Sequence, residues 1–242
     1  MKGKKKIILE IGSGQGFNTY YLSKNKNNDV TGIDLSRRDI AISKKRYPGV
    51  KYIYMDAEKL KFKKNTFDEI YAMDILEHVD NLNKVLGEIA RVLKPGGKFI
   101  VNIPYHRSEK WLLVVRPTFH KEIHHVRIFG EKELETLLRK KKIRVVRKVK
   151  KDFLQHIELY VLFKRKIKSK TQLSIGSWRD TNFTKFVHLS LLYFHPTVVR
   201  TPLVYFPIWI ITVPIGEGIN YIGNKIFPRS VYYEFVKNKN AK

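Results

Sequence analysis

The segment Ile7–Gly16 constrains the fold more than any other part of the sequence. Ile7–Ile11 is apolar apart from one acid and mostly β-branched, which is typical of a parallel strand covered on both faces. Three glycines follow, Gly12, Gly14 and Gly16. Glycine lets the backbone turn sharply beneath a ligand that a Cβ would keep at a distance. The pattern therefore predicts a strand followed by a nucleotide-cofactor turn.

The spacing of these glycines argues against a dinucleotide site. In the G-x-G-x-x-G fingerprint, the third glycine lets the first helix pack closely on the strand. Phe17 holds that position here, and its large ring does not suit that role. A cofactor with a single nucleoside fits the turn better.

Two acids follow the next predicted strands. Asp34 lies at the end of a strand over residues 29–35, and Asp56 follows a strand over residues 51–55. A carboxylate at a strand tip can accept hydrogen bonds from both ribose hydroxyls, and a second one suits the adenine amino group. The alternative is that each acid only ends its strand, as turn-forming carboxylates often do.

The order of the remaining elements carries a resemblance to a known family. A fourth strand over residues 67–73 leads into Asp74-Ile-Leu-Glu-His78, a helix over about 81–93 runs into Lys94-Pro-Gly-Gly97, and a fifth strand follows over 98–102. Over about residues 7–164 the chain resembles the class I S-adenosylmethionine-dependent methyltransferases, especially the small-molecule branch that includes ubiquinone and menaquinone biosynthesis enzymes. The resemblance implies an α/β fold with a doubly wound, Rossmann-like sheet of seven strands.

The same resemblance implies S-adenosylmethionine as the cofactor and a role for individual residues. The glycine turn would hold the methionine part, one acid the ribose, the other the adenine, and the tip of the fourth strand a backbone contact. The implied cofactor residues are Glu10, Gly12, Ser13, Gly14, Gly16, Asp34, Leu35, Asp56, Ala57 and Met73.

Two domains are expected. Residues 1–168 form the cofactor-binding domain, with residues 104–130 as a substrate-side insertion. A helix over 131–138 and strands over 143–149 and 156–163 would complete the sheet, the last strand antiparallel. Residues 169–242 form a C-terminal hydrophobic and aromatic appendage.

Four of the eight histidines lie in the insertion, at positions 106, 120, 124 and 125. Methyl transfer to a hydroxyl or an acidic carbon needs a base, and we take His106, His124 and His125 as candidates. The alternative is a purely structural role, which also applies to His78. His120 and His124 could share one helical face as metal ligands, but no third ligand is evident, so no metal is predicted.

The appendage is rich in aromatic and aliphatic residues between Phe186 and Val236. Arg200 and the prolines at positions 196, 202, 207 and 214 interrupt its apolar run, which argues against a spanning helix. Short helices in a membrane interface, with aromatic rings at headgroup depth, fit this composition. A lid over the cofactor or a homo-oligomer contact fits it as well.

The chain is strongly basic, with a formal net charge of +26, and nine of the thirteen residues 139–151 are Lys or Arg. The charge indicates an anionic surface, either phospholipid headgroups or nucleic acid. A solvated Lys-rich face of a heat-adapted protein is the alternative, although matching Glu is scarce. Asn102-Ile-Pro-Tyr105 is similar to a signature of RNA adenine methyltransferases, but it follows the fifth strand instead of the fourth, so we decline that assignment.

These observations favour an S-adenosylmethionine-dependent methyltransferase that acts at O or C on a small or amphiphilic acceptor, such as a quinone, an isoprenoid or a lipid-linked sugar. The alternatives are an RNA methyltransferase and a non-catalytic cofactor-binding or membrane-scaffolding protein. With no cysteine, a disulfide framework and a Cys-based zinc site are excluded. The first residues lack an apolar signal segment, so we expect a cytoplasmic protein, peripheral on the cytoplasmic membrane face.

Overall fold

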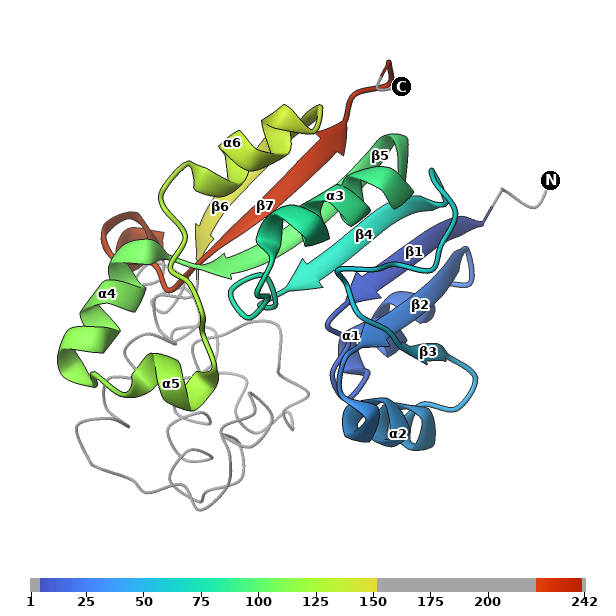
Figure 1. Ribbon diagram of the computed structural model, residues 1–242, viewed down its shortest axis with the longest axis horizontal. Helices are drawn as coiled ribbons and strands as arrows, with labels where there is room; N and C mark the ends of the chain where they lie inside the picture. The colour runs from blue at the N-terminus through green and yellow to red at the C-terminus, as the bar shows by residue number, and fades with distance from the viewer. Residues whose placement is uncertain (1–4, 152–220, 241–242) are drawn as a thin grey trace, which may run out of the picture. The chain divides into compact units, whose positions relative to one another are not determined.

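The computed structural model describes residues 5–151 and 221–240 (Figure 1). Its strands are β1 (Lys6–Ile11), β2 (Asn28–Asp34), β3 (Lys51–Tyr54), β4 (Phe67–Met73), β5 (Leu93–Pro104), β6 (Ile143–Lys151) and β7 (Ser230–Lys237). Its helices are α1 (Phe17–Ser23), α2 (Arg37–Arg46), α3 (Leu82–Val92), α4 (His106–Val115), α5 (Phe119–Ile123) and α6 (Glu133–Lys140), and residues 221–226 form a further helical turn.

All seven strands belong to one sheet, in the order β3-β2-β1-β4-β5-β7-β6. The pairs from β3 to β5 are parallel, and the arrow of β7 runs against its neighbours (Figure 1). The order reverses between β1 and β4, so the loops after these two strands lead away from each other. Ligands bind at such a switch point in open α/β sheets. The predicted fold class is confirmed.

Continuous apolar runs build the core of the sheet. Leu9 and Ile70, on adjacent parallel strands, are fully buried, and Leu86 and Ile89 on α3 are equally buried. These two α3 residues are three positions apart and share one helical face. Asn81 caps this helix by accepting a hydrogen bond from Lys84 N at 3.1 Å. The first four predicted strands and the helix agree with the structure to within about two residues, which is the usual uncertainty of element ends.

The seventh strand differs from the prediction. It is Ser230–Lys237, which we had assigned to the aromatic appendage, and it lies between β5 and β6. The predicted closing strand, residues 156–163, and the boundary at residue 168 lie outside the described residues. Alternate residues of β7 are buried, and the ring of Phe235 stacks on that of Phe99 of β5 at a centroid distance of 6.1 Å. An aromatic segment that alternates in this way is an inner strand of the sheet.

The end of β7 also secures α3. The buried Lys237 Nζ donates hydrogen bonds to Ala90 O and Leu93 O, both at 2.7 Å, and to Asn65 Oδ1 at 3.1 Å. The two carbonyls belong to the end of α3, where helical acceptors lack partners within the helix. Burial lowers the pKa of this ammonium.

The basic run over residues 139–151 covers the end of α6 and the whole of β6. Because β6 lies at one end of the strand order, its charged side chains protect an exposed sheet edge from pairing with other chains. Two of them have acidic partners: Arg147 pairs with Glu234 at 3.1 Å and Lys148 with Glu135 at 2.8 Å. Part of the basic charge therefore has a structural role.

The chain divides into two compact units. The first, the sheet unit, comprises residues 5–103, 129–149 and 232–240 of the described chain. The second unit comprises residues 104–128, 150–151 and 221–231 of the described chain, so it contains α4 and α5, and its first segment overlaps the predicted insertion 104–130. In its backbone, Arg229 N donates to Lys151 O at 3.0 Å, and Tyr105 N donates to Arg229 O at 2.8 Å. The chain thus leaves the sheet after β6 and returns beside its point of exit.

Within residues 5–151 and 221–240, no helix combines the length and the apolar character needed to cross a bilayer.

Candidate cofactor site

The glycine turn between β1 and α1 folds back on the end of β2. Gly12 N and Ser13 N both donate to Ile33 O at 2.9 Å, and Gly16 N donates to Ser13 O at 2.9 Å. Gly12, Gly14 and Gly16 have φ angles of 73°, 49° and 87°. Side chains with a Cβ rarely adopt such angles, so the sequence permits this turn at these positions.

Two of these glycines have different reasons to lack a side chain. A Cβ on Gly12 would lie 2.6 Å from Ile75 Cγ1, in the loop after β4, so glycine is needed there for packing. At Gly14, no heavy atom of the described residues lies within 4 Å of the Cβ position. Gly14 therefore borders open space, as expected where a ligand approaches the backbone.

Asp34 joins the tip of β2 to this turn. Its Oδ2 accepts a hydrogen bond from Gly14 N, and its Oδ1 accepts one from Ser36 N, both at 2.8 Å. A carboxylate has about four acceptor positions. Two remain after these backbone contacts, so the half-buried Asp34 can still accept the two hydroxyls of a ribose.

Ser13 offers an unused polar atom in the same turn. Its side chain is buried, and its Oγ has no hydrogen-bond partner among the described residues. A buried hydroxyl without a partner is unfavourable by about 1–3 kcal/mol. A polar ligand in the turn would remove that penalty, so Ser13, Gly14 and Asp34 together fit a nucleoside cofactor with polar substituents.

Glu10 is held by the first helix. It is almost fully buried and accepts hydrogen bonds from Asn18 Nδ2 at 2.7 Å and from Thr19 Oγ1. Burial raises the pKa of this carboxyl. In the described structure its contacts fix α1 against β1, behind the glycine turn.

The other cofactor candidates lie at the carboxyl edge of the sheet. Leu35 follows β2 and is 62% exposed. Asp56 and Ala57 follow β3, where Asp56 Oδ1 accepts Glu58 N at 2.8 Å. Met73, half-buried, ends β4. All four predicted positions are thus strand tips or the residues that follow them.

The structure adds contacts of three residues, Tyr52, Asp74 and Asn102, that were not among the predicted site residues. Tyr52 of β3 donates its hydroxyl to Gly16 O at 2.8 Å and so supports the glycine turn. Burial, with a smaller effect of the Glu10 charge, raises the pKa of Tyr52 to about 12. Asp74 has a φ of 52°, and its Oδ1 accepts a hydrogen bond from Asn102 Nδ2 at 2.7 Å. A non-glycine residue in this conformation often marks a functional site.

A family model described as a methyltransferase domain matches residues 9–101, which contain this turn and all of these strand tips. Residues 9–101 therefore resemble a methyltransferase domain. The cofactor expected from the sequence, S-adenosylmethionine, agrees with the single-nucleoside site formed by the glycine turn and Asp34.

Two curated relatives match this chain over part of its length. A sterol 4-C-methyltransferase of Caenorhabditis elegans is 38% identical over 78 residues, which cover 30% of this chain and 23% of that protein. A phthiotriol/phenolphthiotriol dimycocerosates methyltransferase of Mycobacterium tuberculosis is 34% identical over 97 residues, or 39% of this chain and 36% of that protein. The chain therefore matches well under half of the length of either relative.

A solved structure agrees with the same fold. The S-adenosylmethionine-dependent methyltransferase of Thermotoga maritima superposes with a TM-score of 0.52 and 28% identity over 62% of this chain and 69% of that one.

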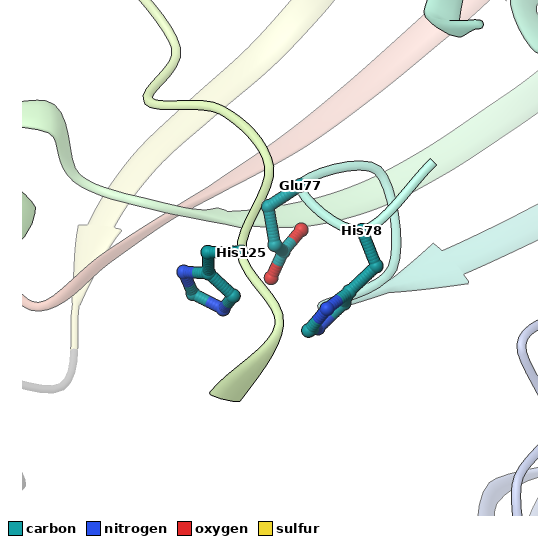
Figure 2. Close-up of side chains that lie close together, drawn as sticks. All are labelled: Glu77, His78 and His125. Carbon is teal, nitrogen blue, oxygen red and sulfur yellow. The ribbon is translucent and has the colours of Figure 1, made fainter. Parts of the chain in front are cut away.

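The loop after β4 carries two titratable side chains next to each other, Glu77 and His78 (Figure 2). Glu77 is 1% exposed, and His78 is half-buried, with its backbone N donating to Ile75 O at 3.0 Å. This backbone contact holds the loop whose Ile75 side chain faces Gly12.

The second unit contains the histidines proposed as bases. His106 is the first residue of α4, with its ring 4.5 Å from that of Tyr105. His124 follows α5, is exposed and has a left-handed φ of 58°. His125, labelled in Figure 2, is more buried, and its Nδ1 lies 2.8 Å from Glu109 Oε2. Of the three, the structure places His125 against a carboxylate.

Proposed function

We propose that the protein transfers a methyl group from S-adenosylmethionine to the O or C atom of a small or amphiphilic acceptor. The observation that carries the proposal is the Asp34 carboxylate, bonded to the turn through Gly14 N at 2.8 Å, inside a domain that matches methyltransferases. When bound, S-adenosylmethionine supplies a methyl group on a sulfonium cation. The residues of this chain then have to orient the acceptor behind that methyl group.

The implied cofactor residues take their roles from their positions. Gly12, Ser13, Gly14 and Gly16, with Glu10 behind them, would surround the methionine part. Asp34 and Leu35 would contact the ribose, Asp56 and Ala57 the adenine, and Met73 would offer its backbone.

An acceptor hydroxyl or acidic carbon also has to lose a proton. We propose that the base is His106, His124 or His125 of the second unit, because an imidazole accepts protons near neutral pH. Replacing the base with Gln should lower turnover by about 10²–10⁴ and leave cofactor affinity nearly intact. Full activity in all three variants would assign these histidines to structural roles.

A lipid-like acceptor is favoured within this proposal. Two of the curated relatives are named for a sterol and for phthiotriol/phenolphthiotriol dimycocerosates. The apolar, aromatic composition of residues 186–229, which precede β7, and the formal charge of +26 suit an amphiphilic acceptor at an anionic membrane surface. We therefore keep a peripheral position on the cytoplasmic membrane face, and a homo-oligomer contact, as parts of the proposal. Most of this segment lies outside the described residues.

A transfer experiment tests the activity and the acceptor class together. The full chain is incubated with methyl-labelled S-adenosylmethionine and, in parallel, with a lipid extract, a water-soluble metabolite extract and total RNA. Label in the lipid fraction, lost in Asp34→Ala, is the expected result. Label in RNA alone would favour the alternative use of the basic face. Cofactor binding without transfer to any fraction would favour a non-catalytic protein.

A further inference from the structure

A carboxylate and two imidazoles converge within the second unit, apart from the cofactor turn. Glu109 of α4 is 5% exposed, His120 lies in α5, and His125 follows α5. His125 Nδ1 and His120 Nε2 each lie 2.8 Å from the same oxygen, Glu109 Oε2. Each of the three side chains offers one possible ligand atom, and these three atoms all lie within 4.8 Å of one another.

Of the two 2.8 Å contacts with Glu109 Oε2, only the one from His125 is a hydrogen bond. His125 Nδ1 forms a hydrogen bond with Glu109. His120 Nε2 is buried and, despite its 2.8 Å distance, lacks hydrogen-bond geometry with Glu109 or any other acceptor among the described residues. Buried ring nitrogens normally have a partner. A ligand between these atoms would supply one for His120.

The surrounding chain holds the three side chains in place. His125 N donates to His120 O at 2.9 Å, which fixes the spacing between the two imidazoles. The buried Leu112 and Phe119 pack together at the join of α4 and α5, and the Phe119 ring lies 6.1 Å from that of His120. Arg116 and Glu122 pair at 2.6 Å across the same turn. The cluster is therefore built into the folded unit.

The chemistry of the three side chains suits a divalent cation, because a carboxylate oxygen and two ring nitrogens meet at one point. Two imidazoles and one carboxylate form a ligand set that proteins use for zinc and for non-haem iron, with positions left open for water or substrate.

We propose that Glu109, His120 and His125 bind one divalent transition-metal ion, with Zn²⁺ as the reference ion. Metal–ligand bonds of about 2.0–2.2 Å in a tetrahedral site put neighbouring ligand atoms about 3.3 Å apart. The two 2.8 Å contacts would have to widen by about half an ångström to admit the ion. An ion here would join α4 to α5, and it would leave His106 and His124 as the candidate bases.

The structure also changes the histidine pair considered from the sequence. The helical spacing suggested His120 with His124 and offered no third ligand. His124 is exposed in a left-handed conformation, whereas His125 is turned toward Glu109. Glu109 is the third ligand, supplied by a different helix.

Metal titration of the full chain tests the inference without S-adenosylmethionine. The protein is stripped with a chelator and titrated with Zn²⁺ by calorimetry and with Co²⁺ by visible absorption, and bound metal is counted by mass spectrometry. We expect one saturable site and a visible Co²⁺ spectrum. His120→Gln and His125→Gln should each weaken binding at least about ten-fold.

Matched controls locate the ion. His124→Gln and His78→Gln remove histidines outside the cluster and should leave metal affinity unchanged. Glu109→Gln should also abolish metal binding. If that variant does not fold, His120→Gln tests the same site, because the side chain of His120 is less buried than that of Glu109. Absence of saturable binding, or affinity that falls with His78→Gln but not with His120→Gln, would overturn the inference. Because no cofactor is present, these outcomes are independent of methyl transfer.

Discussion

Removal of the Asp34 carboxylate tests the cofactor site most directly. In Asp34→Ala, the bound ribose loses a charged acceptor, and so do Gly14 N and Ser36 N, each now 2.8 Å from a carboxylate oxygen. A hydrogen bond to a charged group contributes about 1.5–3 kcal/mol. If the ribose loses the equivalent of one such bond, the affinity for S-adenosylmethionine should fall by about ten- to 150-fold.

The isosteric variant separates charge from shape. In Asp34→Asn the amide has one acceptor oxygen, so its NH₂ group must face one of the two backbone donors. We expect an affinity between those of the wild type and Asp34→Ala. Asp29→Ala is the matched control, because Asp29 is exposed at the opposite end of the same strand. That variant should bind the cofactor as the wild type does.

Calorimetric titration with S-adenosylmethionine measures all four proteins, and circular dichroism confirms that each is folded. A folded Asp34→Ala variant with wild-type affinity would refute the assignment of the ribose acceptor. Equal losses in Asp29→Ala and Asp34→Ala would show a general effect of negative charge and would also count against it.

Three further predictions concern residues that support the fold and the turn. Burial raises the pKa of Tyr52 to about 12 in the folded state, above the usual 10, so this residue should contribute about 2–3 kcal/mol to the decline in wild-type stability between pH 10 and 12, as the unfolded state loses that proton. In denaturant titrations, the decline of Tyr52→Phe over the same pH range should be smaller by about that amount. Lys237→Met leaves helix-end carbonyls without donors and should lower the free energy of unfolding by about 1–3 kcal/mol, measured with urea. Gly12→Ala should destabilise more than Gly49→Ala in thermal melts, because both glycines have positive φ but only the first would bring a Cβ against Ile75; equal losses would mean that backbone strain alone is responsible.

The sequence predicted the parts of the fold that depend on local patterns. Strands such as Ile7–Ile11 are buried on both faces, so they stand out in the sequence as continuous apolar runs. Asp34 and Asp56 could be assigned to strand ends because they come at or directly after such runs. These features need only short stretches of chain and one topology rule. The hydrogen bond from Gly14 N to Asp34 was not predicted from the sequence, and the structure adds it where the parallel strands β1 and β2 end side by side.

The parts that failed depend on pairing between distant segments. Val231, Tyr233 and Phe235 alternate along the chain, which is the signal of a strand, but the aromatic rings favoured a surface tail. Only the neighbours β5 and β6 identify it as an inner strand. The sequence also did not identify Glu109 as a candidate metal ligand, because an acid between Arg107 and Lys110 resembles an ordinary surface residue. Its contacts with His120 and His125 are visible only in the folded structure.

The position of β7 has a consequence for how the protein is made. Because β7 lies between β5 and β6, its residues must leave the ribosome before β6 has any neighbour in this sheet. During synthesis β5 presents an unpaired edge, and β6 stays unpaired while residues 152–229 are added. Exposed strand edges of this kind are prone to aggregate in nascent chains. A stop codon in that stretch would remove the inner strand on which both of its neighbours depend.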